Sequence, residues 1–241
     1  MEIKGKNILI TGSAKRIGKY LALNLAKEGA NIVIHYKSSE KEAKKLKEDI
    51  KNFGVDAISI KANLEKEDDV KKLAYESLNY FKKIDILINN ASIYYPTPIF
   101  EENLNDLDKF YKVHIKAPFI LSKIIGKNML ENKSGRIINI VDYSPLRPYK
   151  DFTPYIVSKG GLLTLTKSLA KEFAPYVLVN AVLPGPIVPP EDTKDIQTPL
   201  KKTLLKKWAG EKEIFKAVKY LIETDFTTGA FIPVEGGRLQ W

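Results

Sequence analysis

Short apolar segments alternate along this chain with longer segments whose apolar residues recur at helical spacing. The short segments are rich in Ile and Val at consecutive positions, which is typical of strands buried on both faces. We expect strands at residues 7–10, 31–36, 57–60, 84–89, 136–141, 177–183 and 230–234. We expect helices at residues 17–28, 40–52, 67–81, 104–129 (in one or two pieces), 155–173 and 212–223. This alternation predicts an α/β fold, a doubly wound parallel sheet with helices on both faces.

Composition excludes several kinds of site. The 241 residues fit one domain, 1–241, since single α/β domains often reach about 250 residues. There is no cysteine, which excludes thiol catalysis, disulfides and cysteine-ligated zinc. The two histidines, His35 and His114, leave little for a metal site, and we expect no metal.

The formal net charge of +10 would allow a polyanionic partner. The charged helix at 40–52 nevertheless mixes both signs at i,i+4 spacing, which favours a solvated face over a nucleic-acid surface. No apolar segment approaches the roughly 18 residues of a membrane span, and no targeting segment is visible. We therefore expect a soluble, cytoplasmic protein that binds neither nucleic acid nor membrane.

A glycine-containing turn follows the first expected strand, in the segment TGSAKRIG at residues 11–18. Its glycines let the backbone approach a pyrophosphate, and the helix that starts here offers its positive N-terminus to the charge. The segment is less than the full G-x-G-x-x-G fingerprint, but a doubly wound sheet binds a dinucleotide at this place. The expected cofactor contacts are Gly12, Lys15, Arg16, Ile17 and Gly18.

The second expected strand ends in HYKSS at residues 35–39. An acidic residue here would bind the ribose 2′-hydroxyl of NAD, and the segment has none. A lysine and two hydroxyls, with Arg16 and Lys15 nearby in such a fold, could hold a 2′-phosphate instead. The sequence thus predicts NADPH (NADP+) as cofactor, with contacts from His35, Tyr36, Lys37, Ser38 and Ser39.

Tyr155 and Lys159 stand four residues apart on an expected helix, so the phenol and the ammonium share one face. A nearby ammonium stabilises phenolate and lowers the tyrosine pKa from about 10. Tyr155 would then be a general acid usable near neutral pH. The spacing alone is a weak signal, but it becomes strong after the fifth strand of a dinucleotide-binding fold.

These features, with the segment NNAS at residues 89–92, resemble the short-chain dehydrogenase/reductase family over nearly the whole chain. The resemblance includes PGPI at residues 184–187, which looks like the family's nicotinamide-side loop. It implies a single-domain Rossmann fold of about seven strands, a homotetramer or homodimer, and a substrate-binding flap at about residues 186–210. It also implies that Lys159 binds the nicotinamide ribose, with further cofactor contacts from Tyr155, Asn63, Leu64, Asn90, Ala91, Ser92, Pro184, Gly185 and Ile187.

Two departures from the family pattern occur together. Arg16 stands where the family usually has a third glycine, and Asp142 stands where it usually has a serine. With the segment NNASIYYPTP at residues 89–98, these departures resemble the pteridine reductase-like branch. That resemblance implies that the Tyr94 ring stacks on a pterin and that Arg16 reaches toward phosphate and pterin. The implied substrate contacts are Arg16, Tyr94, Asp142 and Tyr155.

Asp142 and His114 bear on the chemistry. An ionised carboxylate only accepts hydrogen bonds and repels negative charge, which argues against unaided ketone reduction. A protonated Asp142, its pKa raised by burial, would suit proton delivery to a ring nitrogen, although Asp142 could instead only position Tyr155. His114 replaces the family asparagine that helps hold a water near the lysine, and imidazole either relays protons or closes that path.

The sequence therefore indicates an NADPH-dependent reductase that transfers hydride to a C=N or C=O group of a small molecule. Asp142, Tyr155 and Lys159 are the expected catalytic residues, and a pteridine-type substrate is favoured. One alternative is a carbonyl reductase acting on 3-oxoacyl thioesters or sugars. Another is a non-catalytic NADPH-binding sensor, which would have lost the tyrosine and lysine. The basic amphipathic segment at residues 200–208 is expected to belong to the flap, with its apolar face on the pocket.

Overall fold

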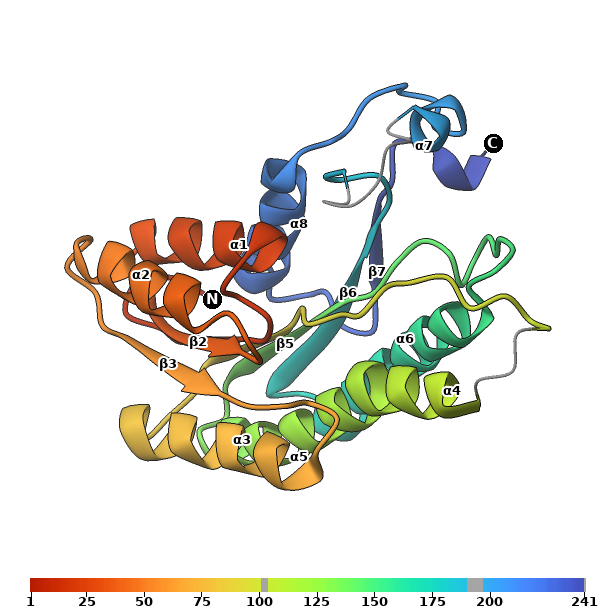
Figure 1. Ribbon diagram of the computed structural model, residues 1–241. Helices are drawn as coiled ribbons and strands as arrows, with labels where there is room; N and C mark the ends of the chain where they lie inside the picture. The colour runs from red at the N-terminus through yellow and green to blue at the C-terminus, as the bar shows by residue number, and fades with distance from the viewer. Residues whose placement is uncertain (101–103, 190–196, 241) are drawn as a thin grey trace.

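The sheet is parallel throughout and has seven strands, in the order β3-β2-β1-β4-β5-β6-β7 (Figure 1). The computed structural model describes residues 1–100, 104–189 and 197–240. The strands are β1 (Asn7–Ile10), β2 (Asn31–Tyr36), β3 (Ala57–Lys61), β4 (Ile86–Asn89), β5 (Gly135–Ile140), β6 (Val177–Pro184) and β7 (Phe231–Val234). The expected doubly wound α/β fold is confirmed, and the direction of winding reverses between β1 and β4.

Helices cover both faces of this sheet (Figure 1). One face carries α1 (Arg16–Lys27), α2 (Glu40–Lys51) and α8 (Glu211–Glu223), and the other carries α3 (Glu67–Phe81), α5 (Ala117–Glu131) and α6 (Thr153–Phe173). Alternate residues of a strand point to opposite faces. In β1, Ile8 and Ile10 therefore belong to the core beneath α1 and α8, and Leu9 belongs to the core beneath α3 and α5. Burial on both faces explains why the strand segments are apolar at consecutive positions.

The expected helix at 104–129 is interrupted by a π-helical turn. It begins as α4 (Leu104–Tyr111), continues as the π-helical segment η1 (Lys112–Lys116), and ends as α5. Such turns occur frequently at functional sites, and this one contains the buried His114. Other boundaries lie within two residues of the expected ones, and two short helices were not predicted: α7 (Thr198–Lys201) and η2 (Arg238–Gln240).

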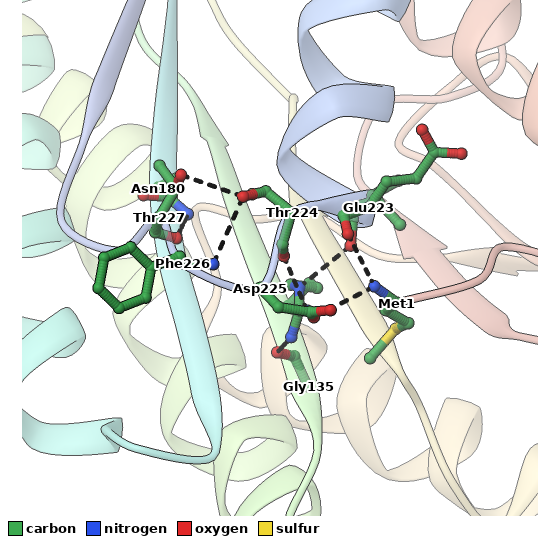
Figure 2. Close-up of polar contacts among 10 residues, drawn as sticks. Met1, Gly135, Asn180, Glu223, Thr224, Asp225, Phe226 and Thr227 are labelled. Carbon is green, nitrogen blue, oxygen red and sulfur yellow. Dashed lines mark hydrogen bonds and ion pairs between the residues drawn. The ribbon is translucent and has the colours of Figure 1, made fainter.

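Two cations bind the C-terminal end of α8, one from the start of β5 and one from the N-terminus of the chain. The buried Arg136 guanidinium donates to the Thr224 carbonyl oxygen at 2.9 Å and contacts the Asp225 carboxylate at 2.5 Å. The α-ammonium of Met1 donates to the Glu223 carbonyl oxygen at 3.0 Å and lies 3.3 Å from Asp225 (Figure 2). The last carbonyls of a helix lack partners within the helix and carry partial negative charge. The cations supply both the donors and the opposite charge.

His35 joins the ends of three neighbouring strands through its ring. Its Nδ1 accepts a hydrogen bond from the Gly12 backbone N–H at 2.9 Å, and its Nε2 lies 3.1 Å from the Ala62 carbonyl oxygen. Since an amide N–H only donates and a carbonyl only accepts, these partners require the neutral tautomer protonated on Nε2. Burial lowers the pKa of His35 from 6.5 to about 4, so the ring remains neutral at ordinary pH.

This buried histidine makes folding pH-dependent. Between pH 6.5 and 4 the unfolded protein takes up a proton at His35 that the folded protein excludes. The free energy of unfolding should therefore fall as pH drops through this window, by about 3 kcal/mol once the pH is below 4. His35→Gln should flatten the dependence because its amide does not titrate. Denaturant unfolding of both proteins from pH 7.5 to 4 measures the difference, and parallel curves would contradict the assignment.

Candidate active site

Two neighbouring cavities lie at the carboxyl ends of the strands, where the winding reverses. The first, of about 330 Å³, follows the turn after β1 and is called the turn cavity. The second, of about 860 Å³, contains the phenol of Tyr155 and is called the tyrosine cavity. Both are lined by Arg16, Ile17, Asn90 and Ser92. Doubly wound sheets bind ligands at this position.

The turn after β1 packs too closely for side chains at its glycines. Gly12 has φ +63°, and a Cβ there would lie 2.9 Å from the Cα of Ala91. A Cβ on Gly18 would collide with the carbonyl oxygen of Gly12. These approaches place backbone, rather than side chains, along the wall of the turn cavity, as binding of a pyrophosphate requires.

Arg16 links the turn to the loop after β6. It has φ +50°, a left-handed conformation that is uncommon for residues other than glycine. This agrees with its place in the sequence, where the family usually has a glycine. Its guanidinium donates to the carbonyl oxygens of Pro189 at 3.2 Å and Val188 at 3.4 Å. Arg16 therefore stands between the two cavities.

The expected cofactor contacts divide between the cavities. The turn cavity is lined by Gly12, Lys15, Arg16, Ile17, Gly18, His35, Lys37, Asn63, Leu64, Asn90, Ala91 and Ser92. The tyrosine cavity is lined by Tyr155, Lys159, Pro184, Gly185 and Ile187. In the described part of the chain, Tyr36, Ser38 and Ser39 line neither cavity. Tyr36 is buried in the core and Ser39 precedes the first residue of α2.

Both lysines of the turn cavity are paired with carboxylates. The Nζ of Lys37 lies 2.5 Å from an oxygen of Glu65, and the Nζ of Lys15 lies 2.9 Å from an oxygen of Glu42. Glu65 itself lines the turn cavity, together with Ile93 and Val113. Sequence reasoning missed these three contacts: Ile93 lies within the segment 89–98 but was given no role, and Glu65 and Val113 were not singled out.

The catalytic candidates meet at the edge of the tyrosine cavity. The Tyr155 hydroxyl donates to Oδ2 of Asp142 at 3.0 Å, while Oδ1 of Asp142 accepts from the Ser144 backbone N–H at 2.7 Å. The Lys159 ammonium donates to the Ile140 carbonyl oxygen at 3.0 Å and lies 5.8 Å from the centroid of the Tyr155 ring. The fold thus brings together the three residues that were predicted to be catalytic.

The expected lowering of the Tyr155 pKa is wrong for this arrangement. Burial raises the pKa of Tyr155 well above 10, and the nearby Asp142 carboxylate raises it further. The phenol donates a hydrogen bond to that carboxylate, and this bond stabilises the neutral phenol. Burial also raises the pKa of Asp142 and lowers the pKa of Lys159 to about 8. The proton of Tyr155 is therefore held more tightly, and those of Asp142 and Lys159 are moved toward neutral pH.

His114 connects the loop after β4 to the helix that carries Tyr155. The Ser158 hydroxyl donates to the Tyr155 carbonyl oxygen at 2.7 Å, so Nδ1 of His114 must donate to the Ser158 oxygen, 2.8 Å away. Its Nε2 then accepts from the Ile93 N–H at 3.2 Å and lies 3.0 Å from the Ser92 hydroxyl. Burial, aided by the Lys159 charge, lowers the pKa of His114 well below 6.5. In this arrangement a neutral ring uses both nitrogens for positioning.

Aromatic side chains form one wall of the tyrosine cavity. Tyr94 is stacked on Phe152, with ring centroids 4.7 Å apart and an interplanar angle of 14°. Tyr94 also meets Tyr155 edge to face at 5.0 Å, and Phe152 meets Tyr149 at 5.3 Å. Phe152 therefore already covers one face of the ring expected to stack on substrate. A wall of this kind suits a flat conjugated ligand.

Sequence reasoning overlooked most of this wall. The missed residues that line the cavity include Tyr143, Tyr149, Phe152 and Arg238. The crowding of aromatic residues between Asp142 and Tyr155 was a usable signal for three of them. Arg238 gave no such signal, because it reaches the cavity only through the path of the chain after β7.

The expected flap, residues 186–210, falls partly outside the described residues, which omit 190–196. In the remainder, Pro199, Lys202 and Trp208 line the tyrosine cavity. The expectation that the apolar face of 200–208 lies on the pocket holds for Trp208. It is wrong for Leu204 and Leu205, which do not line the cavity and are 50% and 63% exposed.

Neither a membrane-spanning helix nor a metal-binding cluster is found in residues 1–100, 104–189 and 197–240. No helix within these ranges is both long and apolar enough to cross a membrane. The same ranges contain no group of three or more His, Cys, Asp or Glu side chains placed to hold a metal ion.

Known proteins share this sequence and this fold. The short chain dehydrogenase profile matches residues 6–199. The 3-oxoacyl-[acyl-carrier-protein] reductase FabG of Staphylococcus epidermidis is 32% identical over 241 aligned residues, covering 96% of this chain and 98% of that protein. A blue fluorescent protein from a metagenomic library, solved with NADPH, has a TM-score of 0.93 and 28% identity over 99% of both chains. FolM alternative dihydrofolate reductase 1 from Brucella canis, complexed with NADP, has a TM-score of 0.92 and 30% identity over 100% of this chain and 97% of that one.

The profile match extends from the start of β1 to α7 and includes the glycine turn and the tyrosine and lysine pair. The FabG relative covers nearly the whole chain at more than 30% identity. The resemblance drawn from the sequence is confirmed at the level of the family. The chain belongs to the short chain dehydrogenase family of oxidoreductases.

Proposed function

We propose that this protein is an NADPH-dependent reductase that acts on a pteridine-type ring. The observation that carries the proposal is the hydrogen bond from the Tyr155 hydroxyl to the Asp142 carboxylate at 3.0 Å, beside an aromatic wall. The likeness to the Brucella canis protein, which is named a dihydrofolate reductase, supports the same substrate class.

The donors of the turn cavity fit NADPH. Lys15, Arg16 and Lys37 bring positive charge to its lining, and the glycine turn presents backbone there. The solved relatives that hold NADPH or NADP support this choice of cofactor. When bound, NADPH supplies the hydride. Lys159, which lines the tyrosine cavity, is the residue we assign to the nicotinamide ribose.

Asp142 and Tyr155 together supply the proton in this proposal. Because the Tyr155 pKa is raised, the bare phenolate is costly, and Tyr155 releases its proton most readily while it receives another. A protonated Asp142 can donate to the Tyr155 oxygen as the Tyr155 hydroxyl protonates a ring nitrogen. The raised pKa of Asp142 makes the protonated carboxyl more accessible at mildly acidic pH. Asp142 ends this step ionised and is reprotonated from solvent.

A second candidate is a carbonyl reductase acting on a 3-oxoacyl thioester. The 32% identity to FabG of Staphylococcus epidermidis favours it. Reduction of a carbonyl develops negative charge on oxygen, which an ionised Asp142 would repel and a neutral donor would stabilise. The two candidates therefore predict opposite effects when Asp142 is replaced by a neutral residue.

We further propose that the protein is a homotetramer or a homodimer. Half-exposed apolar side chains on α4, α5 and α6 support an interface there, namely Leu107, Tyr111, Phe119 and Val157. Three further expectations stay predictions. They are a single domain with a substrate flap at residues 186–210, a cytoplasmic location, and the lack of a membrane or nucleic-acid partner.

NADPH should bind more tightly than NADH by at least about tenfold, or about 1.4 kcal/mol. The physical reason is the positive charge of Lys15, Arg16 and Lys37 around the turn cavity, which favours a 2′-phosphate. Titration of the reduced nicotinamide fluorescence with the purified protein measures both dissociation constants. Equal affinities would remove the basis for choosing NADPH.

Tyr155→Phe should lower kcat about 100-fold or more, because it removes the hydroxyl that donates to substrate. Its NADPH affinity should stay near that of the wild type, since the ring remains in place. Lys159→Ala should lower both kcat and NADPH affinity. Steady-state kinetics and nucleotide titration of the two variants separate these effects. A Tyr155→Phe enzyme with undiminished turnover would exclude Tyr155 from proton transfer.

Asp142→Ser should lower activity on a pterin by about tenfold or more, since it removes the proton source behind Tyr155. Activity on simple ketones should hold or rise, because the serine hydroxyl can donate to a developing alkoxide. NADPH oxidation at pH 6 with one pterin and one ketone tests the ratio. Asp142→Asn is the matched control for positioning alone, because its amide oxygen can still accept from Tyr155. If Asp142→Asn keeps the pterin activity, Asp142 only positions Tyr155.

A further inference from the structure

We propose that Glu65 weakens the preference of this protein for NADPH by holding Lys37, the lysine that a 2′-phosphate would engage. The inference rests on the proposed NADPH site. It concerns a carboxylate that belongs to no recognised motif of the sequence and comes from a different strand end than the usual acidic residue.

The two side chains meet across neighbouring strands. Lys37 directly follows β2, and Glu65 lies in the loop after β3, which pairs with β2 in parallel. The Lys37 Nζ and a Glu65 carboxylate oxygen are 2.5 Å apart, and both residues line the turn cavity. The end of β2 is where the adenosine ribose of a dinucleotide lies in this fold. The ion pair therefore stands where a 2′-phosphate would be recognised.

Glu65 is held in place and charged. Its backbone N–H donates to the Asn63 side-chain oxygen at 3.2 Å, and its side chain is 24% exposed. The hydrogen bond from Lys37 lowers the Glu65 pKa, with further help from the charges of Lys109 and Lys112. At neutral pH the pair is thus an ammonium and a carboxylate.

The two nucleotides meet this pair differently. A 2′-phosphate that binds Lys37 must first displace the Glu65 carboxylate from the Lys37 ammonium. The uncharged 2′-hydroxyl of NADH requires no such exchange. Breaking an ion pair near the surface costs little by itself, so competition for Lys37 should weaken NADPH binding several-fold rather than abolish it. Glu65 therefore lowers the NADPH/NADH preference that the three cations create.

Glu65→Gln tests this directly. NADPH should bind about five-fold more tightly to the variant, a difference of about 1 kcal/mol, while NADH affinity should change less than about two-fold. Nicotinamide fluorescence titrations of each nucleotide give the two dissociation constants without any turnover. Raising the salt concentration should reduce the gain, because the pair is near the surface.

Glu67→Gln is the matched control. Glu67 is two residues further along, pairs with Lys71 at 2.7 Å and Lys116 at 2.8 Å, and does not line the turn cavity as described. Glu67→Gln changes the net charge by the same amount as Glu65→Gln, at a position two residues away. The control should leave the ratio of NADPH to NADH affinity unchanged. An equal shift in both variants would assign the effect to net charge and overturn the proposal.

The route through Lys37 is tested in a second background. Lys37→Met should weaken NADPH binding, and in Lys37→Met the further change Glu65→Gln should improve it less than about two-fold. A full five-fold gain without Lys37 would overturn the competition. An unchanged ratio of NADPH to NADH affinity in the single variant Glu65→Gln would also overturn the proposal. If wild-type protein binds neither nucleotide, the proposed function fails instead, and the two failures are thereby distinguishable.

Discussion

Parallel pairing of the strands is the constraint on which the rest of this protein depends. A parallel strand must return by a crossover, and the crossover helices bury both faces of the sheet. All strands then end at the same edge. The loops at that edge bring together residues as distant in sequence as Gly12, Asn90 and Asp142. The sheet and crossover helices that form the core therefore also position the residues of the site.

At this edge, burial changes the acidity of three groups at once. It raises the pKa values of Asp142 and Tyr155 and lowers that of Lys159 to about 8. The Asp142 carboxylate accepts a hydrogen bond from the Tyr155 hydroxyl, and the Lys159 ammonium donates one to the Ile140 carbonyl oxygen. Replacement of the usual serine by Asp142 thus changes the electrostatics of the whole group. In the proposed function, the proton donor is therefore the pair Asp142 and Tyr155 rather than a tyrosine of lowered pKa.

The sequence predicted the sheet well because strands buried on both faces leave a strong apolar pattern, as in residues 31–36. It also predicted the turn at 11–18 and the pairing of Tyr155 with Lys159, which depend on local spacing. It failed where the outcome depends on which distant groups lie closest. The Lys37–Glu65 pair requires β2 beside β3, and the direction of the Tyr155 pKa is set by burial of the phenol and by the Asp142 carboxylate beside it. No local sequence pattern predicts the Lys37–Glu65 contact or the surroundings of the Tyr155 phenol.

The neutral state of His114 has a consequence for how this position can vary in evolution. A carboxamide and a neutral imidazole each have a donor group and an acceptor group, so an asparagine can be exchanged for a histidine with one hydrogen bond of each kind preserved. A protonated ring would have two donors, and Nε2 could no longer accept from the Ile93 N–H. At this position burial keeps the ring neutral even at mildly acidic pH. The substitution therefore preserves the hydrogen-bonding roles over a wider pH range than it would on an exposed helix.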